Sequence, residues 1–264
     1  MIRREPQGSH FFEIFVSKCF DICFEICYNL FWKTQLCTAW LERDGIEMKK
    51  LAVFDLDGTL LDSLGDLARC CNQALEEAGL PTHSVDAYRY FVGGGLAVLL
   101  DKAIADKDKT PENIEKVKKR DVELYNEVCK NESKAFPGTV EMLKKLRANG
   151  VITAVATNKP DTMCHFLMDS VFPGCIDISY GQREDIAKKP DPAVVYRIMQ
   201  DAGVTEKKDV IYVGDSNVDI FTGLNAGVDT VGVLWGFRPE KELVDAGARL
   251  LCSTNQELYD LIMK

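Results

Sequence analysis

Two carboxylates one residue apart follow a short apolar run in this 264-residue chain. Residues 52–63 read AVFDLDGTLLDS, so Asp55 and Asp57 come directly after an expected buried strand. Alternation along an extended chain places Asp55 and Asp57 on one side and Leu56 on the other. Two like charges held so close need a shared proton or a cation between them. The alternative is a strand that ends in an Asp-rich turn, where Gly58 frees the backbone to bend.

Short apolar strands alternate with helical stretches from Met48 onward. This alternation predicts an α/β fold whose parallel sheet is covered by helices on both faces. No convincing strand appears between the first one and Val151, so a helical insertion should interrupt the sheet there. After the first strand at 51–54, the expected strands lie at 151–157, 176–180, 210–214 and 230–234, and the expected helices at 64–79, 95–105, 111–130, 161–170, 192–202 and 217–226.

Polar residues follow several of these strands. Ligands of open α/β sheets bind beyond the carboxyl ends of the strands, so functional side chains should gather at that edge. Their recurrence there favours a functional site over an Asp-rich turn. The candidates are Thr157 and Asn158 after residues 151–156, Asp215, Ser216 and Asp219 after residues 210–214, and Lys188 and Lys189 ahead of a helix near Pro190.

Composition excludes several classes of function. A net charge of −9 leaves no basic face for nucleic acid or an anionic lipid surface. Ten Cys form no C-x-x-C pair, and only three His could complete a zinc site. We therefore expect free buried thiols in a reducing compartment, and a cytoplasmic location. An acidic protein that handles anionic substrates must recruit local cations or a metal.

Residues 1–47 differ from the remainder. Their best structured interpretation is an amphipathic helix, because charges such as Lys18, Asp21 and Glu25 interrupt the apolar residues. These charges argue against a membrane span and against a signal peptide. We expect an N-terminal extension that is either a mis-assigned start before Met48 or a helix that packs on the core or mediates dimerisation.

Four motifs resemble those of the haloacid dehalogenase-like hydrolases: FDLDGTLLDS, ATNK, KKPDP and VGDSNVD, in this order. The position of the helical insertion resembles the subgroup whose cap lies between the first and second motifs. The stretches FVGGGLAVLL, FPGTVEMLKKLRANG and GVLWGFRPEKELVDAGA are similar to bacterial phosphoglycolate phosphatases. The resemblance implies a Rossmann-like catalytic core at 48–62 and 136–264 with an inserted α-helical cap at 63–135.

The family's catalytic roles carry over to matching positions. By this resemblance Asp55 is the nucleophile that forms an aspartyl-phosphate, which splits one difficult hydrolysis into two easier steps. The side chain of Asp57 protonates the leaving alkoxide and then deprotonates the attacking water. Thr157, Asn158 and Lys189 hold the non-bridging phosphoryl oxygens, with Lys189 supplying a fixed positive charge.

The resemblance also implies a Mg²⁺ cofactor. Its ligands are a carboxylate oxygen of Asp55, the backbone carbonyl of Asp57 and a carboxylate of Asp215, all hard oxygen donors. Asp219 either holds the waters of the metal or caps its helix, and we favour the former. Two further features stay open: Arg238 reaches substrate or pairs with Glu240, and Gly93, Gly94 and Gly95 form a plain turn or a cap loop over substrate.

The expected function is a Mg²⁺-dependent phosphatase of small anionic phosphomonoesters, with 2-phosphoglycolate favoured, acting as a monomer or homodimer without nucleic acid or a membrane span. Alternatives in the family are a pyrophosphatase or nucleotidase and, less favoured, a sugar phosphomutase. Phosphomutases typically place Glu before the motif Asp, where this chain has Gly214 before Asp215. A non-catalytic binding protein would lose Asp55 or Lys189, and both are present.

Overall fold

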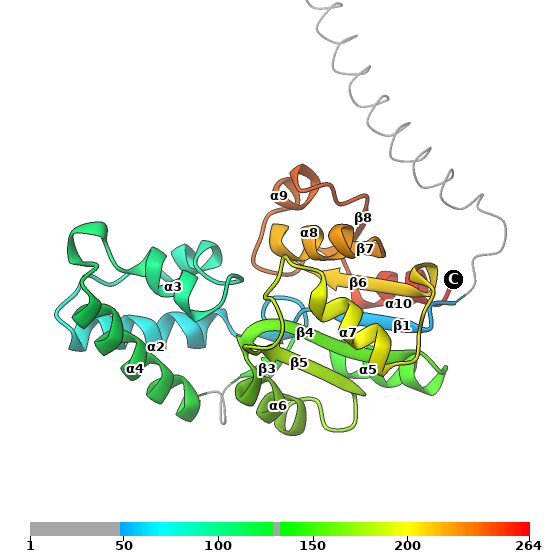
Figure 1. Ribbon diagram of the computed structural model, residues 1–264, viewed down its shortest axis with the longest axis horizontal. Coiled ribbons are helices and arrows are strands. Elements are labelled where there is room, and N and C mark those ends of the chain that lie inside the picture. Colours follow the sequence, from blue (N-terminus) through cyan, green and yellow to red (C-terminus); the bar gives the residue numbers. More distant parts are fainter. Residues whose placement is uncertain (1–47, 129–132) are drawn as a thin grey trace, which may run out of the picture. The chain divides into compact units, whose positions relative to one another are not determined.

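The structure is a computed structural model that describes residues 48–128 and 133–264 (Figure 1). The expectations for residues 1–47 lie outside the described residues.

A six-stranded sheet forms the centre of the described chain. Its strands run in the order β5-β4-β1-β6-β7-β8, and every neighbouring pair is parallel. The first strand of the described residues is thus a central one and is fully buried, as its uninterrupted apolar run predicts. The strands are β1 (Leu51–Phe54), β4 (Ile152–Pro160), β5 (Ile178–Gln182), β6 (Val210–Gly214), β7 (Asp229–Val233) and β8 (Leu250–Cys252).

Helices cover both faces of the sheet because β1 is apolar on both sides. Phe54 belongs to a core cluster with Leu143 and Leu167, whereas Val53 belongs to a separate cluster with Val195. This arrangement confirms the expected α/β fold with a Rossmann-like parallel sheet. The helices of the core are α5 (Thr139–Ala148), α6 (Asp161–Ser170), α7 (Ala193–Asp201), α8 (Asn217–Ala226), α9 (Glu240–Asp245) and α10 (Asn255–Ile262).

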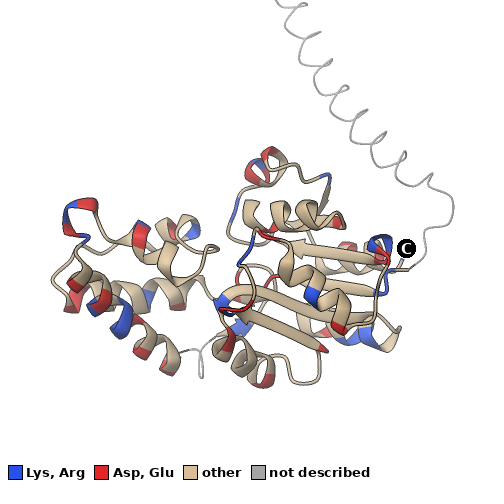
Figure 2. Cartoon of the chain, viewed as in Figure 1, with Lys and Arg blue, Asp and Glu red and all other residues tan. Residues whose placement is uncertain are grey.

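A helical insertion separates β1 from β4 in the sequence, as expected. Figure 1 shows α2, α3 and α4 as a group distinct from the helices that flank the sheet, and α2 packs against α4. Basic residues are grouped in the middle of α4, with acidic residues on either side of them (Figure 2). The insertion contains α2 (Leu64–Glu77), α3 (Leu96–Ala103) and α4 (Pro111–Val128), with 3₁₀ helices at Val85–Tyr90 and Asp106–Asp108.

Two short strands absent from the sequence-based expectation join the ends of the insertion. β2 (Leu61–Asp62) pairs antiparallel with β3 (Lys134–Ala135), with Leu61 opposite Ala135. The expectation that no strand lies between β1 and Val151 was therefore wrong, because strands of two residues are too short to show alternation. The proposed domain boundaries at 63 and 135 stay a prediction.

The cysteines of the described chain are packing residues. Cys71, Cys164, Cys175 and Cys252 are buried and free, and Cys70 is buried, as expected for thiols inside a core. Among the described residues, no helix combines the length and the apolar character needed to cross a membrane.

Candidate active site

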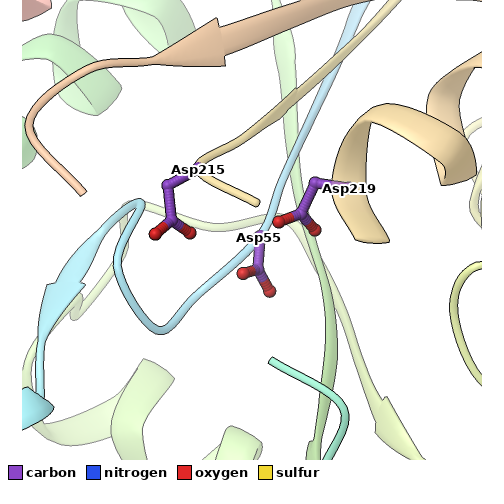
Figure 3. Close-up of side chains that lie close together, drawn as sticks. All are labelled: Asp55, Asp215 and Asp219. Carbon is purple, nitrogen blue, oxygen red and sulfur yellow. The ribbon is translucent and has the colours of Figure 1, made fainter. Parts of the chain in front are cut away.

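Three carboxylates converge at the carboxyl edge of the sheet (Figure 3). In the sheet register Phe54 lies opposite both Val155 and Val213, so the residues that follow these three strands meet at one edge. Asp55 follows β1, Asp215 follows β6 and Asp219 lies in the first turn of α8. Their carboxylate oxygens lie within 4.8 Å of one another, and all three side chains are buried.

The acidic cluster carries more negative charge than its surroundings readily tolerate. Burial raises the pKa of Asp55 to about 7, and the charge of Asp219 adds to the rise while Lys189 opposes it. Burial, with Asp219 and Asp55 nearby, also raises the pKa of Asp215 well above its usual range. Clustered oxygen donors short of positive charge suit a hard divalent cation such as Mg²⁺.

Glycines leave room for the carboxylate of Asp215. A Cβ atom at Gly58 would lie 2.3 Å from Asp215 Oδ2, and one at Gly236 would lie 2.5 Å from the same atom. Gly58 also has φ +91, a conformation that favours glycine. Phe237 N donates to Asp215 Oδ2 at 2.7 Å, and Thr59 Oγ1 donates to Asp215 Oδ1 at 3.3 Å. The backbone therefore wraps closely around this carboxylate and fixes its position.

Lys189 supplies a buried positive charge beside the predicted nucleophile. Its Nζ lies 2.8 Å from Asp55 Oδ1 and 2.7 Å from Asp219 Oδ1. Burial alone would lower the pKa of Lys189, but the charges of Asp219 and Asp55 raise it well above its usual value. The ammonium therefore stays charged at neutral pH.

Asp219 has two structural roles. Its Oδ2 accepts hydrogen bonds from Ser216 N at 3.1 Å and from Ser216 Oγ at 2.5 Å, and the first of these is part of a capping box at the start of α8. Its Oδ1 accepts from Lys189 Nζ. The structure shows the helix cap, and the favoured role of holding the waters of the metal stays a prediction. Asp219 thus fixes both the helix and the lysine that reaches Asp55.

Asp57 pairs with a different lysine. Lys159 Nζ lies 2.9 Å from Asp57 Oδ1 and 2.8 Å from Asp57 Oδ2, and Ser63 Oγ donates to Asp57 Oδ1 at 2.6 Å. Each carboxylate of the D-x-D pair therefore has its own ammonium, Lys189 for Asp55 and Lys159 for Asp57. This arrangement answers how two adjacent like charges coexist at the end of β1.

The predicted phosphate-binding residues lie at the end of β4. Thr157 lines the cavity described below, and its Oγ1 accepts a hydrogen bond from Lys159 N at 3.1 Å. The Asn158 amide donates to Gly93 O at 3.0 Å and accepts from Lys189 N at 3.0 Å. Asn158 thus holds the Lys189 loop and the glycine run, and its contact with a phosphoryl oxygen stays a prediction.

A cavity of about 160 Å³ opens beside the two aspartates. Its walls include Gly93 and Gly95, whose φ values of +107 and +83 favour glycine. Arg238 donates to Val92 O at 3.0 Å, directly before the glycine run, and lies 3.6 Å from Glu242. Arg238 therefore helps to hold the glycine run in position. The core contributes Asp55, Asp57, Thr157, Asn158 and Lys159 to the cavity, and the insertion contributes Leu67, Leu96, Leu99, Asp121, Val122 and Tyr125 among others.

Comparison with known proteins identifies the family. The model of a protein family described as haloacid dehalogenase-like hydrolase matches residues 52–233, which is more than half of the 264 residues. The chain belongs to the haloacid dehalogenase-like hydrolases. The resemblance drawn from four motifs is thereby confirmed.

Relatives of this hydrolase include phosphoglycolate phosphatases. It is 34% identical to that of Pseudomonas putida over 194 residues, covering 72% of this chain and 71% of the relative. It is 35% identical to the phosphoglycolate phosphatase of Haemophilus influenzae over 199 residues, which cover 71% of this chain and 87% of the relative. The crystal structure of a predicted phosphoglycolate phosphatase from Haemophilus somnus matches with TM-score 0.76 at 30% identity, covering 82% and 99%. The expected similarity to an enzyme that hydrolyses phosphoric monoesters is confirmed.

Sequence reasoning missed one prominent residue of this hydrolase. Lys159 is the last residue of ATNK, but it was given no role although it directly follows Asn158. Its side chain is buried and lies 4.6 Å from the centre of the Tyr125 ring in α4. A lysine beside a predicted phosphate-binding pair was the available signal.

Proposed function

We propose that this hydrolase is a Mg²⁺-dependent phosphatase that cleaves small phosphomonoesters, with 2-phosphoglycolate the favoured substrate. The observation that carries the proposal is the placement of Asp55, paired with Lys189, at the wall of a small cavity that Asp57 also lines. Support for the substrate comes from relatives named phosphoglycolate phosphatase at 30% identity or more.

The donors at the cluster are suited to Mg²⁺. We propose that the Asp55 and Asp215 carboxylates and the Asp57 backbone carbonyl hold the ion. All three are oxygen donors, and the two carboxylates are buried and close together. When bound, Mg²⁺ would neutralise charge that otherwise opposes a carboxylate approaching a phosphate dianion.

The side chains then carry two displacements at phosphorus. In the first, an Asp55 oxygen bonds to phosphorus, the phosphorus–oxygen bond to the leaving group breaks, and Asp57, which enters this step protonated and is reprotonated in the second, gives that oxygen a proton. In the second, Asp57 takes a proton from water as the water oxygen bonds to phosphorus, and the bond to Asp55 breaks. Lys189 stabilises negative charge on the phosphoryl oxygens throughout. One ester and one water become one alcohol and one phosphate.

Cavity size disfavours the nucleotidase alternative. A volume of about 160 Å³ is well below the roughly 300–1,000 Å³ typical of sites for drug-sized ligands. A small ester fits this space better than a nucleoside monophosphate does. Inorganic pyrophosphate is also small, so it belongs in the substrate panel.

The phosphomutase alternative meets a packing conflict. A Cβ atom at Gly214 would lie 2.2 Å from the Cβ atom of Asp219. A Glu at this position, as phosphomutases typically have, would displace Asp219 and with it the contact to Lys189. Packing around Gly214 therefore disfavours the phosphomutase alternative.

The experiment is a phosphate-release assay on purified protein with 2-phosphoglycolate, other small phosphomonoesters, nucleoside monophosphates and pyrophosphate, each with Mg²⁺ or with chelator. We expect the highest kcat/KM on 2-phosphoglycolate and no turnover in chelator. Preferred turnover of a nucleotide or pyrophosphate would refute the substrate assignment, and the absence of release from every ester would refute the phosphatase.

A further inference from the structure

Two lysine side chains contact the aspartates of the D-x-D pair, and one of these lysines, Lys159, lines the cavity. Lys189 contacts Asp55, where the phosphoryl group would react, and Lys159 contacts Asp57, which faces the leaving oxygen in the proposed reaction. Among the cavity-lining residues that the structure describes, Lys159 is the only cation. A negative charge on the leaving group therefore has one ammonium to approach.

Lys159 pairs with the carboxylate of Asp57. An ammonium has three N–H donors, and the two oxygens of Asp57 account for two of them. The ion pair with Asp57 keeps Lys159 charged inside the cavity wall.

The Tyr125 side chain lies beside this lysine at the cavity wall. Its hydroxyl is buried and makes no hydrogen bond to any described residue. Buried hydroxyls usually have partners because an unpaired one loses its hydration without compensation. A ligand in the cavity that accepts a hydrogen bond would restore the pairing.

Apolar side chains form much of the remaining wall. Leu67, Leu96, Leu99, Val122 and Met163 line the cavity, so a carboxylate there needs a specific partner to offset its lost hydration. Asp121, four residues before Tyr125 on α4, also lines the cavity. Burial raises the pKa of Asp121 to about 7 against the opposing charge of Lys159, so its protonated form can donate a hydrogen bond.

We propose that Lys159 and the Tyr125 hydroxyl form a subsite for a carboxylate on the leaving group, which makes this enzyme selective for phosphate esters of short hydroxy acids. The inference rests on the proposed phosphatase function and assigns its specificity to these two residues. In a two-carbon ester the carboxyl carbon is two bonds from the bridging oxygen. A substrate of this length can present its bridging oxygen to Asp57 and its carboxylate to the lysine bound to Asp57.

The test compares kcat/KM for 2-phosphoglycolate with that for ethyl phosphate, which has the same length but no carboxylate. The wild-type enzyme should prefer 2-phosphoglycolate. Lys159→Met should reduce the ratio of the two constants about 10- to 100-fold, the range for a lost hydrogen bond to a charged group. Lys159→Arg should recover part of the ratio, and Lys145→Met, at an exposed lysine of α5, should leave it unchanged.

Tyr125→Phe keeps the test decisive if the lysine variants fold poorly, because it removes only one unpartnered oxygen. It should lower the same ratio about 3- to 10-fold through a larger KM for 2-phosphoglycolate. The ratio isolates recognition of the carboxylate, since any loss of support for Asp57 affects both esters.

Three outcomes separate this inference from the proposed function. Phosphate release from no ester overturns both. Turnover with an unchanged ratio in Lys159→Met and Tyr125→Phe overturns the subsite and leaves the phosphatase. A wild-type preference for phosphoethanolamine would show that the cavity, through Asp121, selects a cation instead, and would also overturn the subsite.

Discussion

Replacing Asp121 with Asn should change how the stability of the metal-free protein depends on pH. Asp121 is a buried carboxyl of α4, 5% exposed, whose pKa burial raises to about 7 from an ordinary value of 3.8, with Lys159 opposing the rise. Between these values the folded protein binds a proton that the unfolded chain releases. The contribution of Asp121 to stability therefore falls as pH rises through this window.

The size of the effect follows from the two pKa values. One pKa unit corresponds to about 1.4 kcal/mol, so the shift from 3.8 to about 7 corresponds to roughly 4 kcal/mol over the full window. Between pH 5 and pH 8, the contribution of Asp121 to the unfolding free energy changes by about 3 kcal/mol. The amide introduced by Asp121→Asn cannot titrate, so the stability of this variant relative to the wild type should rise by about this amount between pH 5 and pH 8.

Urea unfolding of both proteins in chelator at pH 5, 6, 7 and 8 measures this difference. Chelator keeps metal binding at Asp55 and Asp215 out of the comparison. Any constant cost of burying an amide cancels because only the change with pH is compared. A difference in unfolding free energy that stays flat from pH 5 to pH 8 would refute the assignment of a raised pKa to Asp121.

Three further predictions address the metal, the buried lysine and the glycine run. Asp215→Ala should raise the Mg²⁺ concentration for half-maximal phosphate release more than about tenfold, since even outer-shell changes cost that much; full activity in chelator would contradict it. Lys189→Met should lower the unfolding free energy by about 3–5 kcal/mol in urea melts because it leaves buried carboxylates unpaired, and a loss below about 1 kcal/mol would contradict a buried ion pair. Gly95→Ala should lower kcat/KM on 2-phosphoglycolate because its Cβ atom would lie 3.0 Å from Asn158 O. Gly79→Ala is the matched control, with a similar φ of +75 and nothing within 4 Å, and equal activity losses in both would make the run a plain turn.

Strand ends were the part of the site that the sequence predicted well. Asp55, Thr157 and Asp215 each follow a short apolar run, and parallel strands in register bring such residues to one edge. Both the position of these residues after apolar runs and the meeting of parallel strand ends can be predicted without knowing which distant residues are in contact. The fold and the meeting of these candidates were therefore accessible from local pattern alone.

The pairing of Lys159 with Asp57 was not accessible in the same way. The register between β4 and β5 shifts between Ala156 and Pro160, so simple alternation does not give the direction of the Lys159 side chain. Asn158 shows the same limit, because its amide contacts Gly93 and Lys189, which are 65 and 31 residues away. Such contacts depend on how the loops pack, which local sequence does not encode.

The proposed chemistry depends above all on Asp55 as the nucleophile, and phosphate release from 2-phosphoglycolate by Asp55→Asn in the presence of Mg²⁺ tests that role. Thermal unfolding first verifies that the variant is folded. An amide cannot attack phosphorus to form the covalent intermediate, so we expect no release above the uncatalysed rate. Release at the wild-type rate from folded Asp55→Asn would contradict the proposed role of Asp55.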